Sequence, residues 1–192
     1  MGNIIDDIRA NEDTFADRPF NEVDSLALAQ LSYARMPVNV PRLDAEATDV
    51  DLAMVGVRDL LRAECYDDMF GKVWSPSMNV DLLRAMCESP RWRDLRVGGY
   101  VDEFDPETTK QFSACVFDVG DGSSYVAFRG TDSTIVGWKE DFAMAFRRPV
   151  AAQESAARYL ADIAGLRDGP IMVGGHSKGG NLAVYAAAHA PA

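Results

Sequence analysis

Apolar positions are spaced differently in the two parts of the chain. Up to about residue 92 they recur every three or four positions, which indicates helices, whereas the short apolar runs after Trp92 are typical of strands. Residues 1–20 are polar and acidic, and we expect them to be loosely ordered. Three helices are predicted next, starting at Asp24, at Asp49 and at Asn79 as N-cap, and ending before Pro37, near Glu64 and before Pro90.

The first part, residues 1–92, is therefore predicted to be a mainly helical segment and a candidate cap over the second part. We find no chemistry in it, and its apolar positions are interpreted as core. The second part, residues 93–192, begins with three predicted strands, and Asp121-Gly122 is a strong hairpin signal between the last two. These strands cover residues 95–104, 111–119 and 123–129.

A crossover helix follows a long loop over residues 130–146. Pro149 opens this helix, which is expected to end near Gly165 and to lead into a strand that starts at Ile171. Strand, helix and strand in this order form the βαβ unit of a parallel α/β sheet. The residues predicted to lie on the buried side of the helix are Ala152, Ala156, Tyr159, Leu160 and Ile163.

The last predicted strand runs into a glycine-rich turn with the pattern Gly175-x-Ser177-x-Gly179, after which an alanine-rich helix starts. This is the pattern of a nucleophile elbow, in which a sharp strand-to-helix turn holds the serine hydroxyl clear of the backbone. Strand and helix pass so close that only glycine, which has no Cβ, fits two residues to either side. A phosphate-binding loop would need Ser or Thr after the lysine, but Gly179 follows Lys178, so that motif is excluded.

Composition narrows the choice of partners. The net charge is −11, which disfavours nucleic acid and anionic membrane surfaces, because both attract positive patches. No apolar run approaches the ~18 residues of a membrane span, and the N-terminus does not have the pattern of a signal peptide. The three cysteines match no metal-binding pattern. We therefore expect a cytoplasmic protein without metal or cofactor.

Three stretches together resemble one group of enzymes. Residues 126–132 are VAFRGTD, residues 137–142 are GWKEDF, and residues 175–183 are GHSKGGNLA. In this order they resemble the lipase class 3 branch of the α/β-hydrolases, and more narrowly a bacterial group of lipase-like proteins called Mbeg1-like. Residues 21–26 and 31–33 also resemble the N-terminal helix of that group.

The resemblance implies a fold class and a site. The fold would be the N-terminal half of an α/β-hydrolase sheet, a three-layer αβα arrangement preceded by the helical segment. Ser177 would attack the carbonyl carbon of an ester, thioester or amide, so that the partner is a small acyl substrate or a lipid. The backbone N–H groups of Lys178 and Thr131 would form the oxyanion hole. Lys178 departs from the leucine common in class 3 lipases, so its side chain either points to water, as we expect, or meets an acidic group across the site.

A general base is missing from the expected place. The order in α/β-hydrolases is Ser, then Asp or Glu, then His, but no acidic residue follows Ser177. His176 adjoins the serine and His189 lies twelve residues further on, so both are interpreted as structural or solvent-facing. Asp132 and Asp141 precede the serine and are interpreted as loop-ordering carboxylates. A Ser-Lys dyad remains formally open, through Lys72, Lys110 or Lys139.

We therefore expect that further βα units follow Ala192 with the acid and the base, and that the core is cut after the nucleophile helix. We also expect the strand at Ile171 to have an open edge that a neighbouring chain, a second copy or the missing part covers. Three functions stay open: a serine hydrolase, a non-catalytic binding or scaffold protein that keeps the elbow as a turn, and a module that binds anions at the helix N-terminus.

Overall fold

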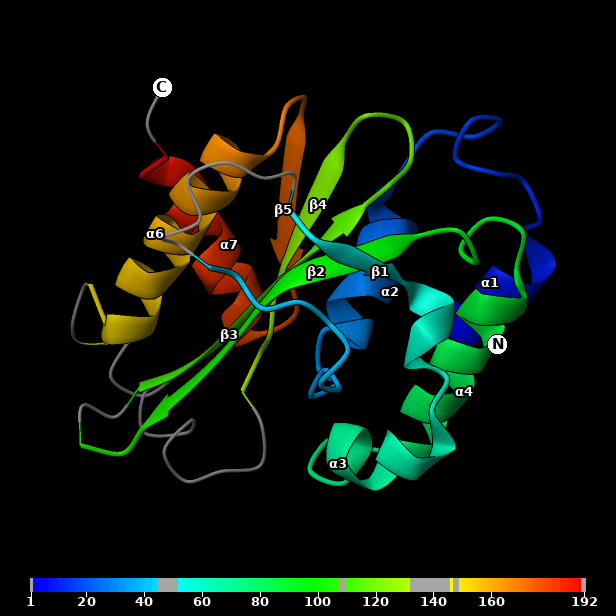
Figure 1. Ribbon diagram of the computed structural model, residues 1–192, viewed down its shortest axis with the longest axis horizontal. Helices are drawn as coiled ribbons and strands as arrows, with labels where there is room; N and C mark the ends of the chain where they lie inside the picture. Colours follow the sequence, from blue (N-terminus) through cyan, green and yellow to red (C-terminus); the bar gives the residue numbers. More distant parts are fainter. Residues whose placement is uncertain (1, 45–51, 108–109, 132–145, 147–148, 191–192) are drawn as a thin grey trace.

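The computed structural model describes the chain except for residues 1, 45–51, 108–109, 132–145, 147–148 and 191–192. Its centre is a five-stranded mixed sheet in the order β1-β2-β3-β4-β5, which follows the order along the chain (Figure 1). The first four strands pair antiparallel, and β4 pairs with β5 in parallel. The strands are β1 (Met54–Gly56), β2 (Arg96–Asp105), β3 (Lys110–Asp118), β4 (Ser124–Phe128) and β5 (Ile171–Gly175).

The predicted strands and the crossover are confirmed. The turn between β3 and β4 has positive φ at Gly120 and Gly122, where glycine avoids the clash that a Cβ would cause. Helix α6 (Ala151–Leu166) connects β4 to β5, which makes the βαβ unit. The five residues predicted for its buried side are all buried. The helix begins two residues after Pro149, and the Gln153 side chain accepts the Val150 N–H at 3.0 Å to cap it.

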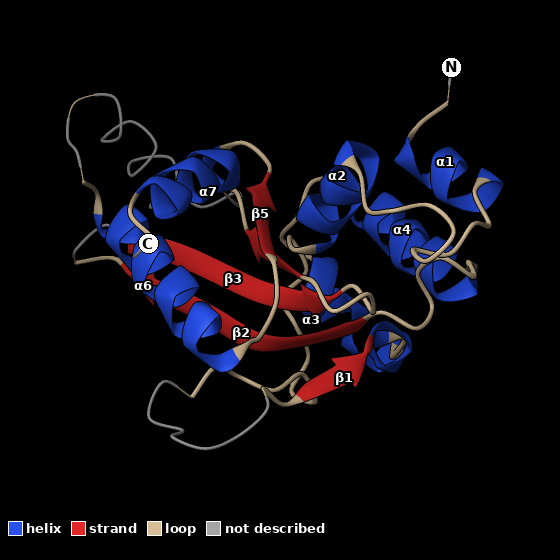
Figure 2. Cartoon of the chain, turned by 90° about the horizontal axis from the view of Figure 1, so that it is seen from above, coloured by secondary structure: helices blue, strands red, loops and turns tan. Residues whose placement is uncertain are grey.

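Helices cover both faces of the sheet (Figure 2). Helices α6 and α7 (Lys178–Ala188) lie on one face, and the helices of the N-terminal part lie on the other. The latter are α1 (Ile4–Ala10), α2 (Glu22–Leu31) and α4 (Pro76–Glu88), with the short α3 (Tyr66–Phe70) beside α4.

Two apolar cores result, one on each face of the sheet. Along β4 the side chains alternate, so that Tyr125 and Ala127 pack under the N-terminal helices, whereas Val126 and Phe128 pack under α6 and α7. The first core combines side chains from residues 1–92 with side chains of β2, β3 and β4. The fold class is therefore a mixed α/β fold with a five-stranded open sheet, and helices α1, α2 and α4 are part of its layers.

The helix predicted from Asp49 to Glu64 is wrong in its described part. Strand β1 pairs with β2 there, and two 3-10 turns, Val57–Leu60 and Ala63–Cys65, follow it. The buried apolar residues of this region lie in a strand and tight turns instead of a helix, because pairing with β2 outweighs the local sequence pattern.

The N-terminal predictions also need correction. Residues 4–10, expected to be loosely ordered, form α1, whose N-cap Asn3 accepts the N–H of Ile5 at 2.8 Å. Helix α2 starts at Glu22, two residues earlier than predicted. Helix α4 starts at Pro76, and Asn79 is not its cap. The Asn79 amide instead donates back to the Trp74 carbonyl at 2.8 Å.

Among the residues that the structure describes, no helix is both long enough and apolar enough to cross a bilayer.

Candidate functional site

Ser177 lies at the junction of β5 and α7, at the carboxyl end of a parallel strand. Its backbone has φ 57° and ψ −122°, a conformation that L-residues rarely adopt. The residue is exposed, and its side chain makes no capping bond to α7. The sharp turn predicted from the Gly-x-Ser-x-Gly pattern is therefore present, with its strain concentrated at the serine itself.

The two glycines of the pattern are required by close packing. A Cβ at Gly175 would lie 2.4 Å from the carbonyl carbon of Gly179, and a Cβ at Gly179 would lie 2.1 Å from the Phe128 carbonyl oxygen. Both contacts are with backbone atoms, which cannot rotate away. The predicted reason for the glycines is thus confirmed, and the close contact extends to β4 as well as to the elbow.

The end of β4 places the stretch that carries Thr131 beside the elbow. Phe128 pairs with Gly175, so the residues after each strand leave the sheet side by side. Gly130 lies directly against the elbow, since a Cβ there would be 2.6 Å from the His176 carbonyl oxygen. Thr131, the next residue, is half-buried. The structure therefore places the two stretches that carry Thr131 and Lys178 beside each other.

The Lys178 side chain does not point to water as we expected. It is 5% exposed, and its ammonium donates to the backbone carbonyl of Gln111 in β3 at 2.7 Å. This bond draws the positive charge away from the N-terminus of α7, where it would be unfavourable. Lys178 thereby ties the start of α7 to β3, a contact between residues 67 positions apart.

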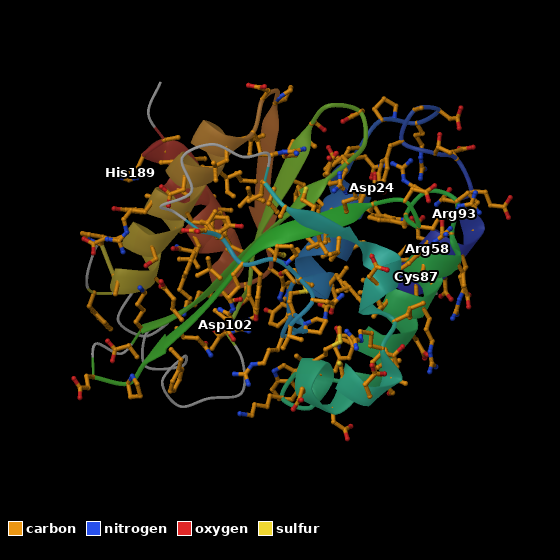
Figure 3. All side chains as sticks on the ribbon, in the orientation of Figure 1. Asp24, Arg58, Cys87, Arg93, Asp102 and His189 are labelled. Atoms are coloured by element: carbon orange, nitrogen blue, oxygen red, sulfur yellow. The ribbon has the colours of Figure 1, made fainter. Side chains whose placement is uncertain are left out.

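Neither histidine is arranged as a base for Ser177. The Nδ1 atom of His176 lies 3.0 Å from the Tyr33 hydroxyl, so its ring turns toward the N-terminal part. His189 stacks on Tyr185 with ring centroids 4.0 Å apart, and lies at the far end of α7 from the elbow (Figure 3).

The lysines weighed for a dyad give no support to one. Lys110 forms an ion pair with Glu103 at the hairpin of β2 and β3, and Lys72 is exposed after α3. Lys139, and the two carboxylates interpreted as ordering the loop, Asp132 and Asp141, lie outside the described residues.

Residues that the sequence did not single out support the site. Arg129, which directly precedes Gly130, donates from its guanidinium to Asp102 of β2 at 2.9 Å, and both side chains are largely buried. Arg35 approaches the same carboxylate at 3.4 Å. Tyr33 meets His176 from the N-terminal part. These contacts could not be predicted from a local sequence pattern, because the two residues of each pair are far apart in the chain. The separation is 27 positions for Arg129–Asp102, 67 for Arg35–Asp102 and 143 for Tyr33–His176.

The described residues contain no group of three or more His, Cys, Asp or Glu side chains placed to hold a metal ion.

Comparison with known families matches residues 86–192 to the Mbeg1-like family model. The chain belongs to the Mbeg1-like family. The matched range covers more than half of the 192 residues, from the end of α4 through the elbow and α7. It leaves out Tyr33 and the helices before α4. Searches of curated proteins and of solved structures each found no match. The Mbeg1-like resemblance is confirmed, and the wider placement among the α/β-hydrolases stays a prediction.

Proposed function

We propose that this member of the Mbeg1-like family is a serine hydrolase of the lipase or esterase type, with Ser177 as its nucleophile. The observation that carries the proposal is an exposed Ser177 with φ 57° and no capping bond, held between Gly175 and Gly179, which have no room for a Cβ. Ser75 before α4 also has a positive φ, of 51°, but it is not flanked by such glycines. The backbone strain of a positive φ costs of order 1–3 kcal/mol and is found where surrounding structure fixes a residue for function. Glycine would adopt this φ at no steric cost, so the turn itself does not require a serine.

The proposed reaction is acyl transfer. The Ser177 Oγ attacks the carbonyl carbon of an ester, thioester or amide, and its proton passes to a base. The tetrahedral oxyanion accepts hydrogen bonds from the N–H groups of Lys178 and Thr131. The bond to the alcohol, thiol or amine then breaks, the leaving group takes up the proton, and water hydrolyses the acyl-enzyme. Lys178 is the first residue of α7, where the helix itself offers no partner for an N–H group.

A non-catalytic binding protein is the second candidate, and one observation favours it. Both histidines of the chain are held by other side chains, His176 by Tyr33 and His189 by Tyr185. The proposal therefore assigns only the nucleophile and the oxyanion donors to the described residues. A serine with oxyanion stabilisation but without a base retains weak reactivity in other serine hydrolases, and this weak reactivity separates the two candidates.

A fluorophosphonate probe tests the proposal directly. The serine oxygen displaces fluoride from phosphorus, and the adduct is located by peptide mass spectrometry. We expect one adduct on the native protein, at Ser177, and none after heat denaturation. Ser177→Ala should abolish the labelling.

Ser77→Ala is the control, because Ser77 is an exposed serine near the start of a helix, as Ser177 is, but is not part of an elbow. This variant should label at the wild-type rate. A native protein that gives no adduct, or a Ser177→Ala variant that labels as the wild type does, would favour the non-catalytic candidate.

A further inference from the structure

The hydroxyl of Tyr33 touches both stretches that make up the candidate site. Tyr33 follows α2 and is 9% exposed. Its oxygen lies 3.0 Å from Nδ1 of His176, the residue before Ser177. A Cβ at Gly130, the residue before Thr131, would lie only 1.9 Å from the same oxygen. One buried side chain thus rests against the elbow on one side and against the end of β4 on the other.

This position governs the distance between the two candidate oxyanion donors. Thr131 is one residue beyond Gly130, and Lys178 is two residues beyond His176. Their N–H groups belong to different segments that leave β4 and β5 separately, so their spacing depends on what holds these segments together above the sheet. Gly130 is held between the Tyr33 hydroxyl and the His176 carbonyl. A change in the Tyr33 contact therefore shifts one donor relative to the other.

Tyr33 is itself held firmly. Its backbone N–H donates to the Gln30 carbonyl at 3.2 Å, and the N–H of Arg35 donates to the Met69 carbonyl at 3.0 Å. The helix before it, α2, is fixed at its start by Asp24, whose carboxylate is bound by the buried Arg91. The backbone that carries the Tyr33 ring is therefore fixed on both sides, which favours a role in positioning a catalytic group.

We propose that Tyr33 is a positioning residue of the acyl-transfer site, which keeps the N–H groups of Thr131 and Lys178 aimed at one oxyanion. The inference rests on the proposed function and extends it to the N-terminal part of the chain, outside the range matched by the family model. Tyr33 does not touch the reacting atoms in this account. It acts through Gly130 and His176, so its loss slows the chemical step and leaves the binding of the probe unchanged.

The variant Tyr33→Phe removes the hydroxyl and keeps the ring. We expect the maximal rate of fluorophosphonate labelling at Ser177 to fall roughly tenfold, since small displacements of reacting groups have effects of this size. The probe concentration at half-maximal rate should stay within about twofold, as uniform binding is untouched.

Tyr159→Phe is the matched control. Tyr159 is a buried tyrosine on the other face of the sheet, and its hydroxyl donates to the Gly99 carbonyl at 2.8 Å. The control loses a comparable hydrogen bond and should lower the melting temperature by a similar amount while it labels at the wild-type rate. Equal labelling rates for Tyr33→Phe and wild type, or an equal loss in both variants, would overturn the inference.

His176→Leu removes the hydrogen bond between Tyr33 and His176 by changing its exposed partner. This variant replaces Tyr33→Phe as the test if Tyr33→Phe does not fold. It should also slow labelling, but by less than Tyr33→Phe does, because it leaves the Tyr33 hydroxyl against Gly130. Where both variants fold, the double variant should be no slower than Tyr33→Phe, because it removes no further contact of that hydroxyl. If the wild-type protein is itself not labelled, the proposed function fails and this inference fails with it. If the wild type is labelled and His176→Leu is as fast, the inference alone fails.

Discussion

Two serines near the starts of helices differ in their backbone conformation, and only Ser177 is held at a φ that serine disfavours. Ser177 has φ 57° at the start of α7, whereas Ser77 lies within the first turn of α4 and is not among the residues with positive φ. Glycine populates positive φ almost freely, whereas inside a helix it costs roughly 0.5–1 kcal/mol relative to alanine. The same substitution should therefore have opposite effects at the two positions.

We expect Ser177→Gly to raise the free energy of unfolding by about 1 kcal/mol, and Ser77→Gly to lower it by roughly 0.5 kcal/mol. Urea unfolding followed by circular dichroism measures both values. If Ser177→Gly is no more stable than the wild type, the serine is not strained, and the main support for a functional elbow is lost.

At the scale of elements, the start of α7 lies so close to β4 that no Cβ fits at Gly179. Gly179 is the second residue of α7, and a Cβ there would meet the Phe128 carbonyl oxygen at 2.1 Å, which forces the helix away from the sheet. Gly165 in α6 has nothing within 4 Å of such a Cβ. Gly179→Ala should therefore destabilise by more than ~2 kcal/mol, whereas Gly165→Ala should stabilise by up to ~1 kcal/mol.

Thermal unfolding of both variants tests this contrast within one protein, since both glycines lie in helices. Gly179→Ala should also lose fluorophosphonate labelling, because the turn that holds Ser177 opens. If Gly179→Ala melts with the wild type, α7 is not held against β4 in the way that the structure describes.

The strands and helices also show which parts of the fold could be predicted from the sequence. Strands β2 to β5 and helix α6 could be predicted because their apolar runs and the Asp121-Gly122 turn are local signals. The region of β1 could not, because it becomes a strand only by pairing with β2 about 40 residues later. At the site, the glycine pattern indicated the elbow itself. The burial of Lys178 and the contact between Tyr33 and Gly130 depend on segments that meet only in the folded chain.

At the scale of the whole molecule, the core beneath the N-terminal helices decides whether the chain unfolds as one unit. Cys87 of α4 and Cys115 of β3 belong to this core, from opposite sides of the boundary that the sequence suggested at residue 92. Burial raises the pKa of the Cys87 thiol to about 11 and that of Cys115 to about 12. Both are therefore protonated and protected in the folded protein, whereas Cys65 is half-buried.

We expect a thiol reagent at pH 7 to label Cys65 alone in the native protein, and to label Cys87 and Cys115 together at one urea concentration. Neutral pH matters, because thiols whose pKa is raised above the ~8.5 of exposed cysteine stabilise the fold fully below that value and lose this contribution as pH rises toward 11 or 12. Mass spectrometry of labelled peptides gives each transition separately. Labelling of Cys87 at a distinctly lower urea concentration than Cys115 would mean that the helices of residues 1–92 detach first, as an independent cap would. Coincident transitions would make those helices part of the structure that supports Ser177.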